Sequence, residues 1–136
     1  MKRRLLFGYQ ILTGLSDTST GLLLVFAPAL TLRLMKLHAA SAALPFLSYT
    51  GVFVLSVGIA CFYGAFLALR TITSEKLEVV WLLTGITRGL VAAFVLISIF
   101  NKALETGWIT VALTNGFIAL LQFYGLARGW LKRVEA

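Results

Sequence analysis

Long apolar runs, separated by short polar stretches, dominate the hydrophobic pattern of this chain. Four of them cover residues 5–27, 46–69, 79–100 and 108–127. Because an α-helix rises about 1.5 Å per residue, each run can cross a hydrocarbon core of roughly 30 Å. The pattern predicts an all-α fold, a four-helix transmembrane bundle that forms a single integral membrane domain over residues 1–136.

The connections between the runs differ in length and character. The first, from Pro28 to Pro45, is the longest, and leucines recur there at helical spacing beside two basic residues. This favours a short amphipathic helix over residues 29–38 in the membrane interface, and a plain loop is the alternative. Residues 70–78 read as a charged turn and residues 101–107 as a tight turn, whereas residues 128–136 form a basic amphipathic tail.

Basic residues are distributed unevenly over the two sides that this topology defines. The N-terminus, the second connection and the tail carry eight Lys and Arg, whereas the first and third connections carry three. The excess of positive charge on cytoplasmic segments places both termini in the cytoplasm. Trp81, Trp108 and Trp130 each fall near the end of a run, where indole rings favour the membrane interface.

Composition supports lipid as the solvent. The chain is 60% hydrophobic and only 12% charged, with a mean hydropathy of +0.94, whereas soluble domains are about one-quarter charged. The net charge is +7, and most of the basic residues lie between and beyond the apolar runs. This placement indicates that they bind anionic lipid headgroups rather than nucleic acid. The single cysteine, Cys61, excludes an intramolecular disulfide and is expected to be a small core residue.

Two short motifs recur and indicate an internal repeat. LTGLSD begins at Leu12 and LTGITR at Leu83, a spacing of 71 residues, with Asp17 and Arg88 in the same slot. CFYGAFLALR in the second run resembles QFYGLAR in the fourth, at a spacing of 61 residues. The sequence therefore predicts two repeated helical hairpins of the same orientation, related by an axis along the membrane normal.

Polar and small side chains form one stripe on each predicted helix. Asp17 and Asn115 are about 12 residues from the cytoplasmic ends of their runs and Arg88 about 9 or 10, which places them near the bilayer centre. Gln10 and Gln122 are each about five residues from such an end and lie at a shallower level. These stripes are expected to face the bundle interior, since small residues let helices approach closely. They contain the following residues: Gln10, Thr13, Gly14, Asp17, Thr20 and Gly21; Gly51, Gly58 and Ala65; Trp81, Thr84, Gly85, Arg88 and Ala92; Ala112, Asn115, Ala119 and Gln122.

Asp17 and Arg88 are the only charges inside the apolar runs, so each is the obvious partner of the other. One interpretation is a buried ion pair that determines which helices meet, because removing one member strands the other. The other is a polar pocket for a ligand, or a proton relay, since ionisable groups within the membrane are often functional. Asn115 and Gln122 fit either interpretation, as interhelical hydrogen-bond donors or as ligand contacts.

The residues for several familiar chemistries are missing from the sequence. The only histidine, His38, lies outside the runs and cannot hold a haem across a bundle, and it is expected on the interfacial surface. Four of the five acidic residues fall in connections or the tail, so no acidic metal site is expected. No catalytic residue, metal or cofactor is therefore predicted.

The chain resembles the DoxX-like group of small bacterial membrane proteins. The shared features are a basic residue before the first span, glycines along it, a proline that closes it, a long first connection and an arginine in the third span: Gly8, Gly14, Gly21, Pro28 and Arg88. The resemblance implies a multi-pass protein of the bacterial cytoplasmic (inner) membrane. The group takes its name from a subunit of a thiosulfate:quinone oxidoreductase, and most of its members have no established activity.

A non-enzymatic accessory or scaffold bundle, working with a membrane protein partner or a second copy of itself, is the leading hypothesis for function. The alternative is an intramembrane binder or carrier of a small amphipathic or anionic ligand, held by Arg88 and oriented by Asn115 and Gln122. Two further alternatives come from resemblances. One is a quinone-linked oxidoreductase subunit, and the other is a small multidrug resistance transporter, which Asp17 in the first span would suit.

Overall fold

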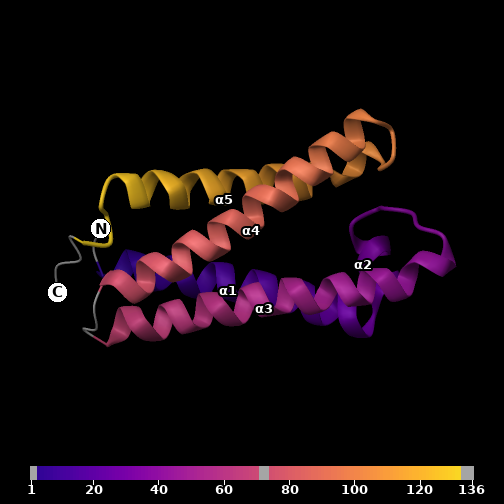
Figure 1. Cartoon of the computed structure of the whole chain (residues 1–136). Helices are drawn as coiled ribbons and strands as arrows, with labels where there is room; N and C mark the ends of the chain where they lie inside the picture. The colour runs from indigo at the N-terminus through magenta and orange to yellow at the C-terminus, as the bar shows by residue number, and fades with distance from the viewer. Residues whose placement is uncertain (1–2, 71–73, 133–136) are drawn as a thin grey trace. The chain divides into compact units, whose positions relative to one another are not determined.

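The computed structural model describes residues 3–70 and 74–132, and these ranges contain helices, turns and no strand. The described part of the chain is therefore all-α, as predicted. Residues 71–73 of the predicted second turn and residues 133–136 of the predicted tail lie outside the described residues. Figure 1 shows the elements in chain order: α1 (Arg3–Phe26), α2 (Pro28–Leu34), the 3₁₀ helix η1 (Ser41–Ala43), α3 (Leu44–Leu69), α4 (Ser74–Phe100), the 3₁₀ helix η2 (Thr106–Trp108) and α5 (Ile109–Ala127).

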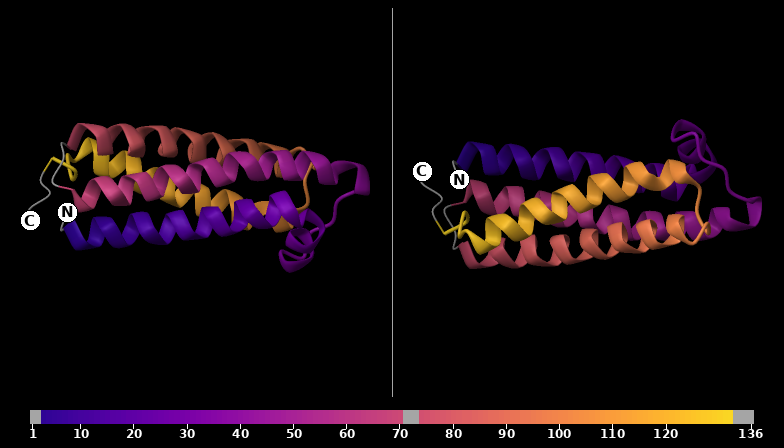
Figure 2. Two further views of the ribbon diagram at one scale, coloured as in Figure 1. Left: turned by 90° about the horizontal axis from the view of Figure 1, so that it is seen from below. Right: turned by 90° about the horizontal axis from the view of Figure 1, so that it is seen from above.

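The helices group into two units, and each unit is a hairpin of two long helices. Residues 4–69 form the first hairpin, in which α1 and α3 lie side by side with α2 and η1 in the connection between them. The described residues from 74 to 132 form the second hairpin, in which α4 and α5 lie side by side (Figure 2).

Close approach of two helices at glycines holds the first hairpin together. A Cβ atom at Gly21 would lie 2.6 Å from the backbone nitrogen of Leu55, and one at Gly51 would lie 2.7 Å from the Cβ of Leu24. Neither position has room for a larger side chain without movement of the neighbouring backbone. The predicted small-residue stripe on residues 46–69 therefore does face another helix, and its three members, Gly51, Gly58 and Ala65, are buried.

Small residues on both helices of the second hairpin lie against side chains of the other helix. Gly125 lies against the indole of Trp81, where a Cβ atom would be 2.7 Å from Cζ3, and against Trp130 in the turn after α5. The five residues predicted for the inner face of α4 are all buried: Trp81, Thr84, Gly85, Arg88 and Ala92. Trp81 is thus a core residue with 1% of its surface exposed, and the prediction that it anchors the membrane interface is wrong.

The neighbours across the first hairpin recur in the second. The sequence offsets of 71 residues (α1 to α4) and 61 residues (α3 to α5) relate the corresponding positions. All six buried residues of α1 map onto buried residues of α4, and Thr13 and Thr84 each donate a hydrogen bond to the carbonyl four residues earlier. Four neighbouring pairs map onto four others: Gly14–Phe62 onto Gly85–Phe123, Thr18–Gly58 onto Gly89–Ala119, Gln10–Gly64 onto Trp81–Gly125, and Gly21–Leu55 onto Ala92–Gly116.

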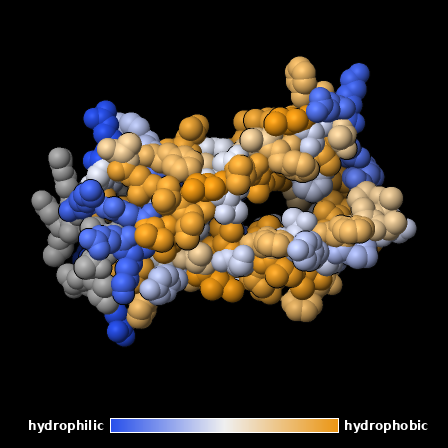
Figure 3. All heavy atoms as spheres, in the orientation of Figure 1, coloured by the Kyte–Doolittle hydropathy of each residue, from blue (hydrophilic) through white to orange (hydrophobic). Residues whose placement is uncertain are grey.

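Three described helices are long and apolar enough to cross a membrane. These segments are Ser41–Leu69, Glu75–Phe100 and Thr106–Ala127. They support an integral membrane protein, and Figure 3 shows hydrophobic side chains over much of the helical surface, with hydrophilic ones gathered toward helix ends. Helix α1 has 24 residues but is not among the three, because the polar stretch from Ser16 to Thr20 lowers its hydropathy.

Helix boundaries differ from the sequence prediction mainly at two places. Helix α4 begins at Ser74, five residues before the predicted start at Val79, so most of the charged stretch is its first turn. Glu75 in that turn suits the positive end of the helix dipole. Helix α2 ends at Leu34, four residues before the predicted end at residue 38.

A Schellman motif explains why α2 is short. The Leu37 N–H donates to the Leu32 carbonyl (2.9 Å), and the Lys36 N–H donates to the Arg33 carbonyl (3.1 Å). Lys36 has φ 56°, the left-handed conformation that this motif requires and that glycine usually supplies. The same motif ends α4, with Lys102 at φ 59°.

Candidate functional site

The predicted polar residues of the second hairpin meet across the interface of α4 and α5. Arg88 is 3% exposed, although it lies in the middle of an apolar helix. Its Nη1 donates a hydrogen bond to Oδ1 of Asn115 on α5 (3.3 Å). The Asn115 amide in turn donates to the carbonyl of Val111 one helical turn earlier (2.9 Å). The guanidinium is therefore held against α5 by a side chain that is itself fixed to its own helix.

One turn of α4 before Arg88, a second hydrogen bond joins the same two helices. Nε2 of Gln122 donates to the hydroxyl of Thr84 (2.8 Å), and that hydroxyl donates to the carbonyl of Val80 (2.7 Å). Gln122 is 1% exposed and Thr84 is 3% exposed, so water does not compete for this bond. Hydrogen bonds between transmembrane helices are worth about 0.6–2 kcal/mol each.

In the first hairpin, Gln10 is fully buried on α1 and lies against Gly64 of α3. Neither polar atom of its amide has a hydrogen-bond partner within the described residues. A buried amide without a partner costs about 1–3 kcal/mol of folding free energy. This position corresponds to Trp81 in the second hairpin, where an indole occupies the same place against Gly125.

The structure therefore brings four residues of the predicted polar cluster together in two pairs, Thr84 with Gln122 and Arg88 with Asn115, and the sequence predicted neither pairing. Asp17 is half-buried on α1, in the other unit from Arg88, and its pairing with Arg88 stays a prediction from the sequence. Cys61 is buried as expected, at 1% exposure. His38 is exposed, as predicted.

The sequence placed Trp81 on the inner stripe but missed its neighbour Gly125, over which the indole lies. A signal was available, because Gly125 follows Gln122 by three residues and so continues the predicted stripe of residues 108–127. Within residues 3–70 and 74–132, no group of three or more His, Cys, Asp and Glu lies close enough to hold a metal ion.

Comparisons of the chain with protein-family models, with curated proteins and with solved structures returned no match. The DoxX-like resemblance therefore stays a prediction.

Proposed function

We propose that this protein is a four-span accessory or scaffold subunit of the bacterial cytoplasmic membrane, without catalytic activity of its own. The observation that carries the proposal is that polar side chains at the interface of the second hairpin hydrogen-bond to one another. Thr84, Gln122, Arg88 and Asn115 are engaged with one another across α4 and α5. Polar groups engaged in this way stabilise a helix pair, and they support a structural role more than a reactive one.

Helix α1 is proposed as the fourth span. Its 24 residues give a length of about 36 Å, which exceeds the hydrocarbon thickness of roughly 30 Å. Its neighbours on α3 correspond pair by pair to those between α4 and α5. These correspondences also support a duplication of one ancestral hairpin, which would give both hairpins the same orientation in the membrane.

Reporter fusions test the four-span topology directly. Fusions after Ala136 and at Ser74 should report the cytoplasm, and a fusion at Ser41 should report the opposite side, because an even number of spans returns the chain to its starting side. Paired cytoplasmic and periplasmic reporters at each position provide the measurement. A cytoplasmic signal at Ser41 would show that α1 does not cross the membrane.

A second candidate function is binding of a small amphipathic or anionic ligand within the membrane, and the buried amide of Gln10 favours it. A ligand that hydrogen-bonds this amide would satisfy both of its polar atoms. Leucine is close to glutamine in volume and has no polar side-chain atom, so Gln10→Leu removes the amide nitrogen and oxygen. If the accessory role is correct, Gln10→Leu should raise the free energy of unfolding by about 1 kcal/mol or more, because a buried polar group without a partner is lost.

Native mass spectrometry of protein extracted with its own lipids separates the two candidates. The accessory role predicts that wild type and Gln10→Leu give the same species apart from the mass of the substitution. That species is either the bare subunit or a complex of fixed stoichiometry. Leu6→Met, at another buried position of α1, is the matched control. A reproducible bound mass that disappears in Gln10→Leu and persists in Leu6→Met would establish the binder instead.

A further inference from the structure

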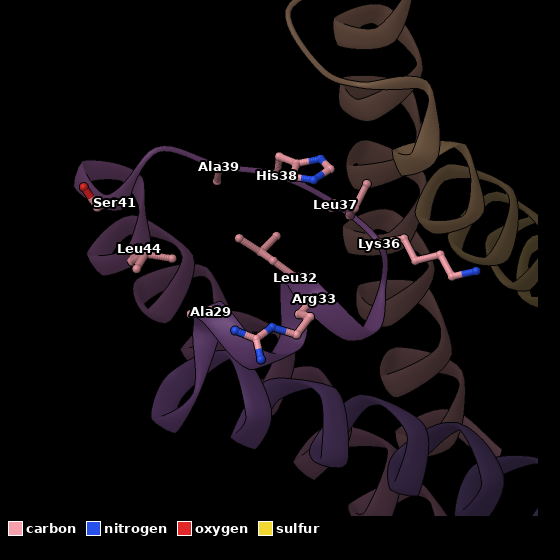
Figure 4. A pocket seen from close by; sticks show the side chains of 9 residues that line it. All are labelled: Ala29, Leu32, Arg33, Lys36, Leu37, His38, Ala39, Ser41 and Leu44. Carbon is pink, nitrogen blue, oxygen red and sulfur yellow. The ribbon is translucent and has the colours of Figure 1, made fainter.

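A pocket of about 580 Å³ opens where the chain leaves α2 and returns toward α3. It lies wholly within the first hairpin, and Figure 4 shows its lining side chains. We propose that this pocket binds one anionic phospholipid, with the headgroup phosphate on the basic side chains and the beginning of the acyl chains on the leucines. The proposal rests on the membrane location proposed above. The lining residues are Ala29, Leu32, Arg33, Lys36, Leu37, His38, Ala39, Ser41 and Leu44.

The Schellman motif at the end of α2 builds this pocket. Its two hydrogen bonds turn the chain sharply, and they bury Leu32 and Leu37, each 4% exposed, as the fixed apolar part of the wall. The same turn leaves Arg33 and Lys36 exposed. In Figure 4, Leu32 lies between Arg33 and His38, and Lys36 extends outward from the turn.

The charge of the lining determines the sign of the ligand. Arg33 and Lys36 contribute two positive charges, and no carboxylate is among the lining residues. Asp17 is the only acidic residue between positions 4 and 69, and it is not part of the lining. An anion in this pocket therefore meets cationic side chains without a competing internal carboxylate.

The apolar lining determines the rest of the ligand. A free inorganic anion would use only the basic side chains and leave the apolar part of the lining unused, whereas a neutral apolar molecule would leave the charges unused. A phospholipid with an anionic headgroup uses both, because its phosphate and its acyl chains are adjacent. Leu30 and Leu34 of α2 are 46% and 65% exposed beside the pocket, as expected for a short helix in contact with lipid.

Lys36 offers a substitution that removes charge without disturbing the turn. Glycine adopts positive φ more readily than lysine, so Lys36→Gly should preserve the Schellman motif. Combined with Arg33→Gln, it removes both positive charges that line the pocket. The matched control is Arg4→Gln with Lys102→Gly, because Arg4 is exposed and Lys102 holds the same position in the Schellman motif that ends α4. Both double variants carry the same net charge.

The experiment is a lipid titration of the full-length protein in a neutral detergent, followed by native mass spectrometry. Phosphatidylglycerol and phosphatidylcholine with identical acyl chains are the two probes, and glycerol phosphate is the free-anion competitor. Wild type should bind one phosphatidylglycerol with a Kd about tenfold lower than that for phosphatidylcholine. Arg33→Gln with Lys36→Gly should abolish this preference, and Arg4→Gln with Lys102→Gly should retain it.

Three results would overturn the proposal. They are equal affinity of wild type for the two lipids, an equal loss of preference in the control variant, and displacement of phosphatidylglycerol by an equimolar amount of glycerol phosphate. The last would identify a free-anion site instead of a lipid site. A wrong prediction of the membrane topology would be recognised separately. The reporter fusions test the topology in cells, whereas the lipid titration is performed on purified protein.

Discussion

Arg88→Ala should lower the free energy of unfolding by about 3–5 kcal/mol if Asp17 is its partner, the largest single effect expected in this chain, and by about 1–3 kcal/mol if Asn115 alone is. The side chain is 3% exposed, and its removal leaves the Oδ1 atom of Asn115 without the guanidinium donor. If the predicted pairing holds, it also strands the carboxylate of Asp17. Equilibrium unfolding in mixed detergent micelles measures the change. Arg128→Ala is the control, because Arg128 is exposed at the end of α5, and it should cost at most about 1 kcal/mol.

The charge exchange Asp17→Arg with Arg88→Asp tests the predicted pair itself. Each single charge reversal should unfold the protein more easily than wild type, and the exchange should recover part of the loss, because opposite charges are again available to each other. No recovery in the exchange variant would mean that Asp17 and Arg88 act independently. Arg88 would then owe its burial to Asn115 and its other neighbours.

Gly21→Ala should destabilise the first hairpin by about 1–3 kcal/mol. The added Cβ would lie 2.6 Å from the nitrogen and 2.7 Å from the Cα of Leu55, so relief requires movement of the α3 backbone rather than rotation of a side chain. Unfolding in mixed micelles again provides the measurement.

Gly8→Ala, on the same helix, is the matched control for Gly21→Ala. No atom lies within 4 Å of the added Cβ at Gly8, and alanine is the better helix former, so the variant should be neutral or more stable by up to about 1 kcal/mol. Equal losses at Gly8 and Gly21 would show that close approach of α1 and α3 is not what makes Gly21 necessary.

Helix faces were predictable from the sequence because their signal is periodic. A stripe at 3.6-residue spacing placed Gln10, Thr13 and Gly14 on the buried side of α1, and the equivalent stripe placed Thr84 and Arg88 on the buried side of α4. The hydrophobic runs likewise located the long helices to within a few residues at most ends. Such predictions need only the spacing of polar and apolar residues within one segment, which can be read directly from the sequence.

The hydrogen bonds between helices and two of the helix ends were not predictable from the sequence. The hydrogen bond from Arg88 to Asn115 spans 27 positions in sequence and depends on the register of two helices. The end of α2 depends on Lys36 adopting a left-handed conformation, which residue type alone would have assigned to glycine. The early start of α4 was not predicted because charged stretches between apolar runs are typical of turns, although Glu75 in a first turn stabilises a helix.

The recurring neighbours of the two hairpins differ in one respect that bears on how the chain assembles. At one level of the first hairpin, a glycine on α1 (Gly21) faces Leu55 on α3, whereas at the corresponding level of the second, Ala92 on α4 faces a glycine on α5 (Gly116). If α4 took the place of α1, Ala92 would collide with the Leu55 backbone. If α1 paired with α5, two glycines would face each other across a void. Helices that are otherwise so alike would thus be sorted by shape, and the mismatched pairings would be disfavoured when each hairpin forms.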